Sequence, residues 1–318
     1  MNNFNFIIFA KFFFMKLVTV GTVAFDDIET PRGRAEMVIG GAATYISRSA
    51  SFFVDNQGIV SVVGGDFPQD ELQEMQSLGI DISGIEVKKD DKSFFWAGRY
   101  HDNMNKRDTL ITDLNVLADF QPKLPESFRT ADYLMLGNLT PDIQMDVLNQ
   151  MTRRPKLVAL DTMNFWMDVA LESLLGVLKR IDVLTINDEE ARQLSGEYSL
   201  VNAAAKIHEL GPKYLIIKKG EHGALLFHEG KVFSFPALPI AEVMDPTGAG
   251  DTFAGGFIGY LAKTEDLSFD NMKRAIVYAS VMASFCVEDF SLSKLKKVNH
   301  LDIAGRVDEF KDMTLFTM

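Results

Sequence analysis

The chain carries one stretch from which the rest can be interpreted: Asp245-Pro246-Thr247-Gly248-Ala249-Gly250-Asp251-Thr252-Phe253-Ala254-Gly255-Gly256-Phe257. The apolar residues that follow Thr252 recur at helical spacing, which predicts a helix that begins near Gly248. Small residues at a helix start leave backbone N–H groups uncovered, and the helix dipole adds positive potential there. The stretch therefore predicts a site for a phosphate group or another anion.

Asp251 falls in the first turn of this predicted helix, beside the anion site. A carboxylate there can take a proton from a substrate hydroxyl, while the amides of Gly248, Ala249 and Gly250 hold the charge that develops. The alternative is a tight turn with Asp251 as an ordinary helix cap. The flanking acids, the threonine and the Gly255-Gly256 pair coincide with the turn, and this combination favours the phosphate site.

The composition bounds the class of protein. The 318 residues carry a formal net charge of −12, and the sequence pI is about 4.9. Such a balance repels nucleic acid and anionic lipid, so we expect neither as a partner. Cys286 is the one cysteine, which rules out an intramolecular disulfide and a cysteine zinc site and favours a reducing, cytoplasmic compartment.

The domain organisation follows from length and pattern. Residues 1–14 are an apolar leader or disordered extension without the features of a secretory signal, and we expect translation to start at Met15. Residues 15–310 form one α/β domain, and residues 311–318 form a C-terminal tail.

Buried strands and helices alternate through most of the domain, which argues for a mostly parallel sheet covered on both faces. Polar residues cluster at the carboxyl ends of the predicted strands, where such sheets bind ligands. The expected strands cover 16–21, 59–63, 133–136, 156–160, 183–186 and 214–217, and the expected helices cover 46–54, 70–78, 141–151 and 171–179.

A second region differs in character. Residues 82–114 consist of short alternating stretches separated by polar turns, and residues 27–39 contain another such stretch. We expect these two segments to form a small antiparallel sheet that is inserted in the domain.

At residues 245–257 the chain resembles the second signature of the PfkB (ribokinase-like) carbohydrate kinase family. Gly40-Gly41, followed by a predicted helix, resembles the first signature, and the resemblance extends from Leu17 to about Ala304. It implies a ribokinase-like three-layer sandwich with the small sheet as a lid. It also implies an ATP-dependent phosphotransferase acting on a hydroxymethyl group of a small sugar or sugar-like acceptor.

The resemblance assigns residues to the acceptor. Asp26 follows the first strand at the family spacing, and the expected substrate-binding set is Asp26, Gly40, Gly41, Tyr45 and Asn138. The sequence departs from the family at Tyr45, where Asn is common, and at Ala24, where Asn is frequent. Both changes put ribose-like recognition in doubt.

The resemblance also assigns a nucleotide site. Asn187 and Glu190 match the family's N-x-x-E motif, which binds the magnesium–nucleotide complex largely through water, although a helix cap explains the same residues. Lys219, Gly220 and Thr247 are expected to contact the nucleotide. Asp245 falls where many members bind potassium.

Other nucleotide-binding and hydrolase classes lack support, because the chain has no P-loop, no dinucleotide glycine motif and no nucleophile elbow. Two alternatives stay open: an adenosine-type nucleoside kinase of the same fold and a non-catalytic nucleotide-binding regulator. An exposed lid edge could pair two subunits into a homodimer, as in some family members.

Overall fold

The computed structural model describes residues 15–315, so the expectations for residues 1–14 and for the end of the tail lie outside it. The strands are β1 (Leu17–Val20), β2 (Ala24–Thr30), β3 (Gly33–Gly40), β4 (Gln57–Gly64), β5 (Ile80–Lys88), β6 (Phe95–Tyr100), β7 (Arg107–Asp113), β8 (Tyr133–Leu136), β9 (Leu157–Asp161), β10 (Val183–Asn187), β11 (Tyr214–Lys218), β12 (Ala224–His228) and β13 (Lys231–Phe235). The α-helices are α1 (Ala42–Ala50), α2 (Gln69–Ser77), α3 (Pro141–Gln150), α4 (Asn164–Val169), α5 (Leu171–Leu178), α6 (Asp188–Ser195), α7 (Leu200–Glu209), α8 (Ala249–Thr264), α9 (Phe269–Cys286) and α10 (His300–Thr314).

The large sheet has nine strands in the order β13-β12-β11-β10-β9-β8-β1-β4-β5. All neighbours from β11 to β5 pair in parallel, and only β12 and β13 at one edge form antiparallel pairs, β12 with β11 and β13 with β12. The prediction of a mostly parallel central sheet is confirmed. The carboxyl ends of the parallel strands consequently lie along one edge of the sheet, and the candidate site residues lie at that edge.

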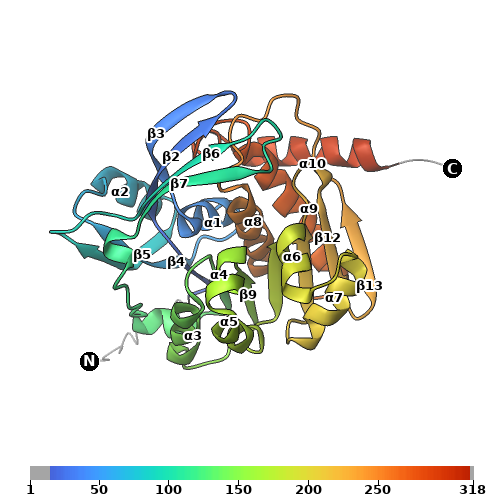
Figure 1. The fold of residues 1–318 in the computed structure, drawn as a ribbon, viewed down its shortest axis with the longest axis horizontal. Coiled ribbons are helices and arrows are strands. Elements are labelled where there is room, and N and C mark those ends of the chain that lie inside the picture. The colour runs from blue at the N-terminus through green and yellow to red at the C-terminus, as the bar shows by residue number, and fades with distance from the viewer. Residues whose placement is uncertain (1–14, 316–318) are drawn as a thin grey trace, which may run out of the picture.

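Helices cover both faces of this sheet, because its central strands are apolar on both sides (Figure 1). In β8, Tyr133 and Met135 pack into a core with α1, α8, α9 and α10. Leu134 and Leu136, which alternate with them, pack into a second core with α3, α5, α6 and α7. The expected three-layer sandwich is present.

The helix that follows the glycine-rich turn, α8, packs closely against α1. A Cβ atom on Gly255 would lie 2.2 Å from the Ile46 carbonyl oxygen, so only glycine allows this approach. On its other side, a Cβ atom on Gly256 would lie 3.0 Å from the Ala279 Cα atom of α9. The two glycines thus hold the start of α8 at a fixed place beside the sheet.

The lid is a second sheet, with the order β3-β2-β6-β7. It lies along one side of the molecule in Figure 1, apart from the strands of the large sheet. The prediction that it is antiparallel holds within its two hairpins, but β2 and β6 pair in parallel where the hairpins meet.

The expected lid segment 82–114 was too wide. Strand β5 pairs with β4 at the edge of the large sheet and is no lid strand. An edge strand with one solvated face has the same alternating pattern as a lid strand, so the sequence pattern did not separate the two. Helix α1 also begins earlier than expected, because Gly41 (φ 93°) caps it.

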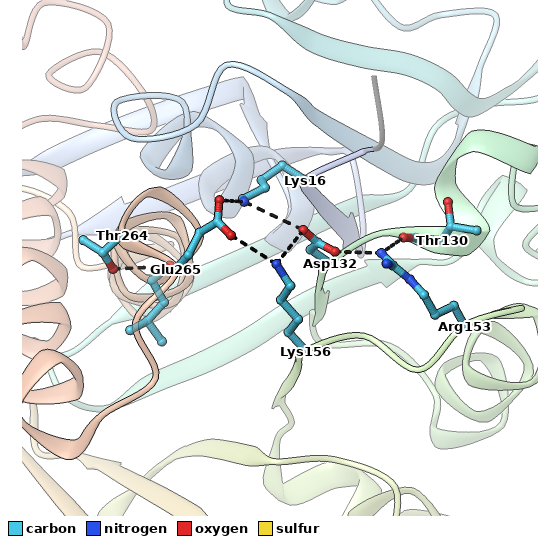
Figure 2. Close-up of polar contacts among 8 residues, drawn as sticks. Lys16, Thr130, Asp132, Arg153, Lys156, Thr264 and Glu265 are labelled. Atoms are coloured by element: carbon cyan, nitrogen blue, oxygen red, sulfur yellow. Dashed lines mark hydrogen bonds and ion pairs between the residues drawn. The ribbon is translucent and has the colours of Figure 1, made fainter. Parts of the chain in front are cut away.

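A network of ion pairs joins the amino ends of the strands to the far end of α8 (Figure 2). The Asp132 carboxylate lies 2.6 Å from Arg153 and 3.1 Å from Lys156, and Glu265 pairs with Lys156 (3.1 Å) and with Lys16. Such partly exposed pairs contribute about 0–1 kcal/mol each. They lie at the opposite end of α8 from Asp251, and we assign them to structure.

The C-terminal helix α10 continues to Thr314, four residues into the segment expected as a tail. None of the helices within residues 15–315 has the length and apolar character that a membrane span requires.

Candidate active site

The glycine-rich turn forms the start of α8, as predicted. Gly248 is the N-cap residue with φ 74°, a left-handed conformation that side chains rarely adopt. The Ala249 N–H donates to the Pro246 carbonyl (3.2 Å). Within residues 15–315, the N–H groups of Gly248 and Gly250 have no acceptor in the protein. Of the three amides expected to face an anion, these two are therefore free to do so.

Asp251 stands in the first turn of α8 beside these amides. The pKa of its carboxyl is raised to about 7, mainly by burial and also by the neighbouring Asp161, while Lys218 and Arg107 oppose the rise. A carboxyl group with a pKa near neutrality can accept a proton and release it at the same pH.

Asp245 and Thr247 connect the turn to its surroundings. The buried Asp245 carboxylate accepts the N–H groups of Thr247 (2.8 Å) and Ser291 (3.1 Å), and burial raises its pKa. The Thr247 hydroxyl donates to the Tyr100 hydroxyl (3.1 Å) on the lid strand β6. The lid is thereby hydrogen-bonded to the residue next to the anion site.

Asp26 lies on β2 where the lid joins the large sheet. Its carboxylate covers Gly40, since a Cβ atom there would lie 1.9 Å from Asp26 Oδ2. The pKa of Asp26 is raised to about 8, mainly by burial and also by Asp245 and Asp251, while Arg107 and the Gly41 N–H oppose the rise. Asp27 instead accepts the Met37 N–H (2.7 Å) within the lid, away from this group.

Tyr45 and Asn138, which were also expected to bind the acceptor substrate, contact other residues of the protein. Tyr45 is buried, and its ring lies under Gly248. The Asn138 amide accepts the indole N–H of Trp166 (2.8 Å) and contacts the Met163 sulfur. Asn138 lies just beyond β8, at the carboxyl edge of the sheet, and Tyr45 lies beneath the glycine turn.

Asn187 and Glu190 form a capping box at the start of α6. The Asn187 side chain accepts the Glu190 N–H (2.8 Å), and Glu190 Oε2 accepts the Asn187 N–H (2.7 Å). The pKa of Glu190 is raised to about 7, mainly by burial and also by Asp161, while Lys218 opposes the rise. The helix cap is therefore present, and the second carboxylate oxygen of Glu190 remains outside it.

A cavity of about 650 Å³ opens beside the glycine turn, large enough for a nucleotide. The lining residues come from the turn, from the β11–β12 connection, from the loop after β13 and from the lid tip, and include Gly250, Gly220, Leu238 and Asn105. Of the residues expected at the nucleotide, Gly220 lines this cavity, and the lysine that lines it is Lys218 and not Lys219. Neighbouring residues of a strand point to opposite sides, so a shift of one position changes the assignment.

Three charged residues of the site were not identified from the sequence: Asp161, Lys218 and Arg107. Asp161 and Lys218 are the last residues of β9 and β11, so their position at the carboxyl ends of buried parallel strands was the available signal. Arg107 begins the lid strand β7, and its charge lowers the pKa of both Asp26 and Asp251. No local pattern distinguishes it from other lid arginines.

Comparison with known proteins gives concordant matches. The family described as pfkB family carbohydrate kinase matches residues 16–297. A cytidine kinase of Thermococcus kodakarensis is 31% identical over 253 residues, which cover 77% of this chain and 88% of that protein. A nucleoside kinase of Methanothermobacter thermautotrophicus is 27% identical over 305 residues, covering 86% and 89%. A solved E. coli structure, assigned as a ribokinase II in complex with ATP and Mg²⁺, has a TM-score of 0.75 at 20% identity and covers 92% of this chain and 99% of its own.

Proposed function

The chain belongs to the pfkB family of carbohydrate kinases, and we propose that Asp251 is the base with which it phosphorylates a hydroxymethyl group of its acceptor. The enzyme is an ATP-dependent phosphotransferase whose acceptor is the alcohol of a sugar or nucleoside. The observation that carries the proposal is the placement of Asp251 beside the free amides of Gly248 and Gly250.

The chemical step follows from this arrangement. The acceptor oxygen attacks the γ-phosphorus of ATP, and its proton passes to the Asp251 carboxylate. The bond from phosphorus to the β-phosphate oxygen breaks, and ADP leaves. The N–H groups of Gly248 and Gly250 donate to the oxygens of the phosphoryl group during transfer, where the helix dipole adds to their effect. The Ala249 amide supports the turn, since it is bonded to Pro246.

The nucleotide fits the cavity beside the turn. Its phosphates would lie toward Gly250 and Lys218, and its remaining parts would contact Gly220 and the lid tip at Asn105. Thr247 and Lys219 do not line this cavity, and their assignment to the nucleotide rests on the family resemblance alone. The relative with bound ATP supports the placement at the level of the fold.

Asn187 and Glu190 fit a hydrated magnesium ion. Glu190 keeps one oxygen outside the capping box, and its raised pKa indicates a carboxylate that a nearby cation would stabilise. The described residues contain no cluster of three His, Cys, Asp or Glu side chains that could hold a metal ion, which suits a cation held through water and phosphate oxygens. Mg²⁺ would neutralise charge on the phosphates during transfer.

On the acceptor side, we propose that Asp26 binds a hydroxyl group next to the one that reacts. Its carboxyl is buried beside Gly40, and its pKa of about 8 lets it donate or accept a hydrogen bond near neutral pH. Gly41 and Asn138 border the same edge of the sheet. Tyr45 contributes from beneath, because its ring supports the turn at Gly248.

Two further features are proposals of the same kind. We propose a potassium ion near Asp245, tested by comparing turnover in K⁺ and Na⁺. We also propose a homodimer through the lid, because the edge strand β7 is exposed along its whole length and carries Leu110 and Ile111 at 50% and 46% exposure. Sedimentation velocity shows whether the protein is a dimer in solution.

The single cysteine, buried at Cys286, supports a cytoplasmic location.

The first experiment measures ADP release from MgATP against a panel of sugars, sugar phosphates and nucleosides, with cytidine, adenosine, ribose and fructose among them. We expect one class of acceptor to support turnover. Asp251→Asn should lower kcat by about 10²- to 10⁴-fold, the usual contribution of a positioned base, and should leave ATP binding intact. Comparable turnover in the variant would refute the assignment of Asp251. Bound ATP without any turnover across the panel would favour a regulator.

A further inference from the structure

Lys218 and Asp161 form a largely buried ion pair inside the site. Lys218 Nζ lies 2.8 Å from Asp161 Oδ2, and the two side chains are 17% and 9% exposed. They end the strands β11 and β9, so the pair crosses the end of β10, where Asn187 stands. The ammonium group is therefore fixed in the middle of the carboxyl edge of the sheet.

The same ammonium lies against the start of α8. A Cβ atom on Gly250 would lie 3.1 Å from Lys218 Nζ, so the space that a side chain would occupy is next to the charge. Lys218 and Gly250 both line the cavity assigned to the nucleotide. The charge and the free Gly250 amide thus belong to one anion site.

The ammonium has hydrogen-bonding capacity to spare. It carries three N–H donors, and within residues 15–315 Asp161 is its one hydrogen-bond partner. Although burial opposes its charge, the carboxylates of Asp161, Glu190 and Asp251 raise the pKa of Lys218, so it stays protonated at neutral pH. Two donors remain for a ligand.

A gain in stability does not explain why the charged pair of Lys218 and Asp161 is buried here. Removing two charges from water costs several kcal/mol per ion, and well-packed apolar residues often replace a buried pair without loss of stability. The carboxylates of Glu190 and Asp251 add negative charge to a place that must receive the phosphates of ATP. A cation here has a function that an apolar pair could not fulfil.

We propose that Lys218 is a catalytic residue whose ammonium donates hydrogen bonds to the phosphoryl group during transfer, and that Asp161 is the positioning residue that holds it against Gly250. The inference rests on the proposed function of the site. The acceptor oxygen–phosphorus bond forms, the bond to the β-phosphate oxygen breaks and the proton goes to Asp251. Lys218 keeps its proton throughout and stabilises the negative charge on the phosphoryl oxygens.

The test compares five variants with the wild type: Lys218→Met, Lys218→Arg, Asp161→Asn, Asp161→Glu and the double variant Asp161→Asn/Lys218→Met. The matched control is Lys213→Met, which removes an exposed lysine just before the amino end of β11. Each protein is measured for kcat and KM with the acceptor found in the panel, for MgADP affinity by calorimetry and for thermal unfolding.

We expect Lys218→Met to lower kcat by about 10²- to 10³-fold, as the loss of one oxyanion donor does, with MgADP affinity changed by only a few fold. Lys218→Arg should recover part of kcat because it keeps the charge. Asp161→Asn should lower kcat, and Asp161→Glu should restore part of it. Lys213→Met should match the wild type.

The double variant separates catalysis from structure. It removes both charges, so no unpaired charge stays buried, and its unfolding temperature should recover toward that of the wild type. A kcat that stays low in this stable protein supports the proposal. Recovery of kcat in the double variant, or kcat within about threefold of wild type in Lys218→Met, overturns it. A wild-type enzyme without turnover on any acceptor would contradict the proposed function itself.

Discussion

The ring of Tyr45 lies directly beneath Gly248, the N-cap residue of α8. A Cβ atom on Gly248 would lie 2.5 Å from three atoms of that ring. Contact with the tyrosine ring therefore fixes the position of the glycine turn, and with it the position of the amides that face the phosphoryl group.

This relationship predicts the effect of Gly248→Ala. The substitution strains a residue at φ 74° and drives a methyl group into a buried ring, so we expect a loss of about 2–4 kcal/mol in the free energy of unfolding. We expect kcat to fall by about 10²-fold or more as the amides shift.

Gly230→Ala is the matched control for this prediction. Gly230 has the same φ of 74°, but nothing lies within 4 Å of its Cβ position. It should cost about 1–2 kcal/mol from the backbone alone and leave kcat unchanged. Equal effects of the two variants on kcat would contradict the role assigned to Gly248.

The pKa of Asp251 predicts a pH dependence. The reaction needs the ionised carboxylate, and the pKa of about 7 belongs to the free enzyme. As pH falls through 7 the carboxyl takes up a proton, so kcat/KM should fall about tenfold per pH unit below that value and reach a plateau above it.

The neighbouring acids must be separated from Asp251 in this profile. Asp26, with a pKa of about 8, and Glu190, with a pKa of about 7, titrate in the same range. The measurement is the pH dependence of kcat/KM in Asp26→Asn. If kcat/KM still falls below pH 7 in this variant, groups other than Asp26 cause the fall. If the fall disappears, Asp26 controls the pH dependence.

Asp26 and Asp27 predict a contrast between adjacent residues. Asp26→Asn removes a buried carboxylate from the acceptor side of the site, and we expect KM for the acceptor to rise about 10- to 100-fold with little change in KM for ATP. Asp27→Asn alters a carboxylate that bonds only within the lid and should leave both KM values unchanged. The measurement is initial-rate kinetics with each substrate varied; an equal response of the two variants would sink the assignment.

Arg107 predicts a role for the lid in the chemistry. Its charge lowers the pKa of Asp26, Glu190 and Asp251. This residue of β7 therefore acts on the acceptor side and on the nucleotide side of the site. In Arg107→Met the pKa of Asp251 should rise, and the acid limb of kcat/KM should move to higher pH. Arg99→Met is the control, because Arg99 on the neighbouring strand β6 pairs with Glu29 at the lid surface (2.9 Å). An unmoved limb in Arg107→Met would contradict the coupling.

Several features of this protein could be predicted from local sequence. The glycine-rich turn, the helix after it and the alternation of buried strands with helices are each specified by residues close together in the chain, and all were confirmed. The order of motifs along the chain was sufficient to indicate the family.

Only the tertiary structure decided which charged groups meet. Lys218 and Asp161 are 57 residues apart and come together because the sheet places β9, β10 and β11 side by side in parallel. Arg107 reaches the site only because the lid folds over it, and Tyr45 lies beneath Gly248 only because α1 packs against α8. Periodicity and spacing report which face of an element is buried. They carry no information about which distant element covers that face, because the pairing of strands and the packing of helices are set by the whole chain.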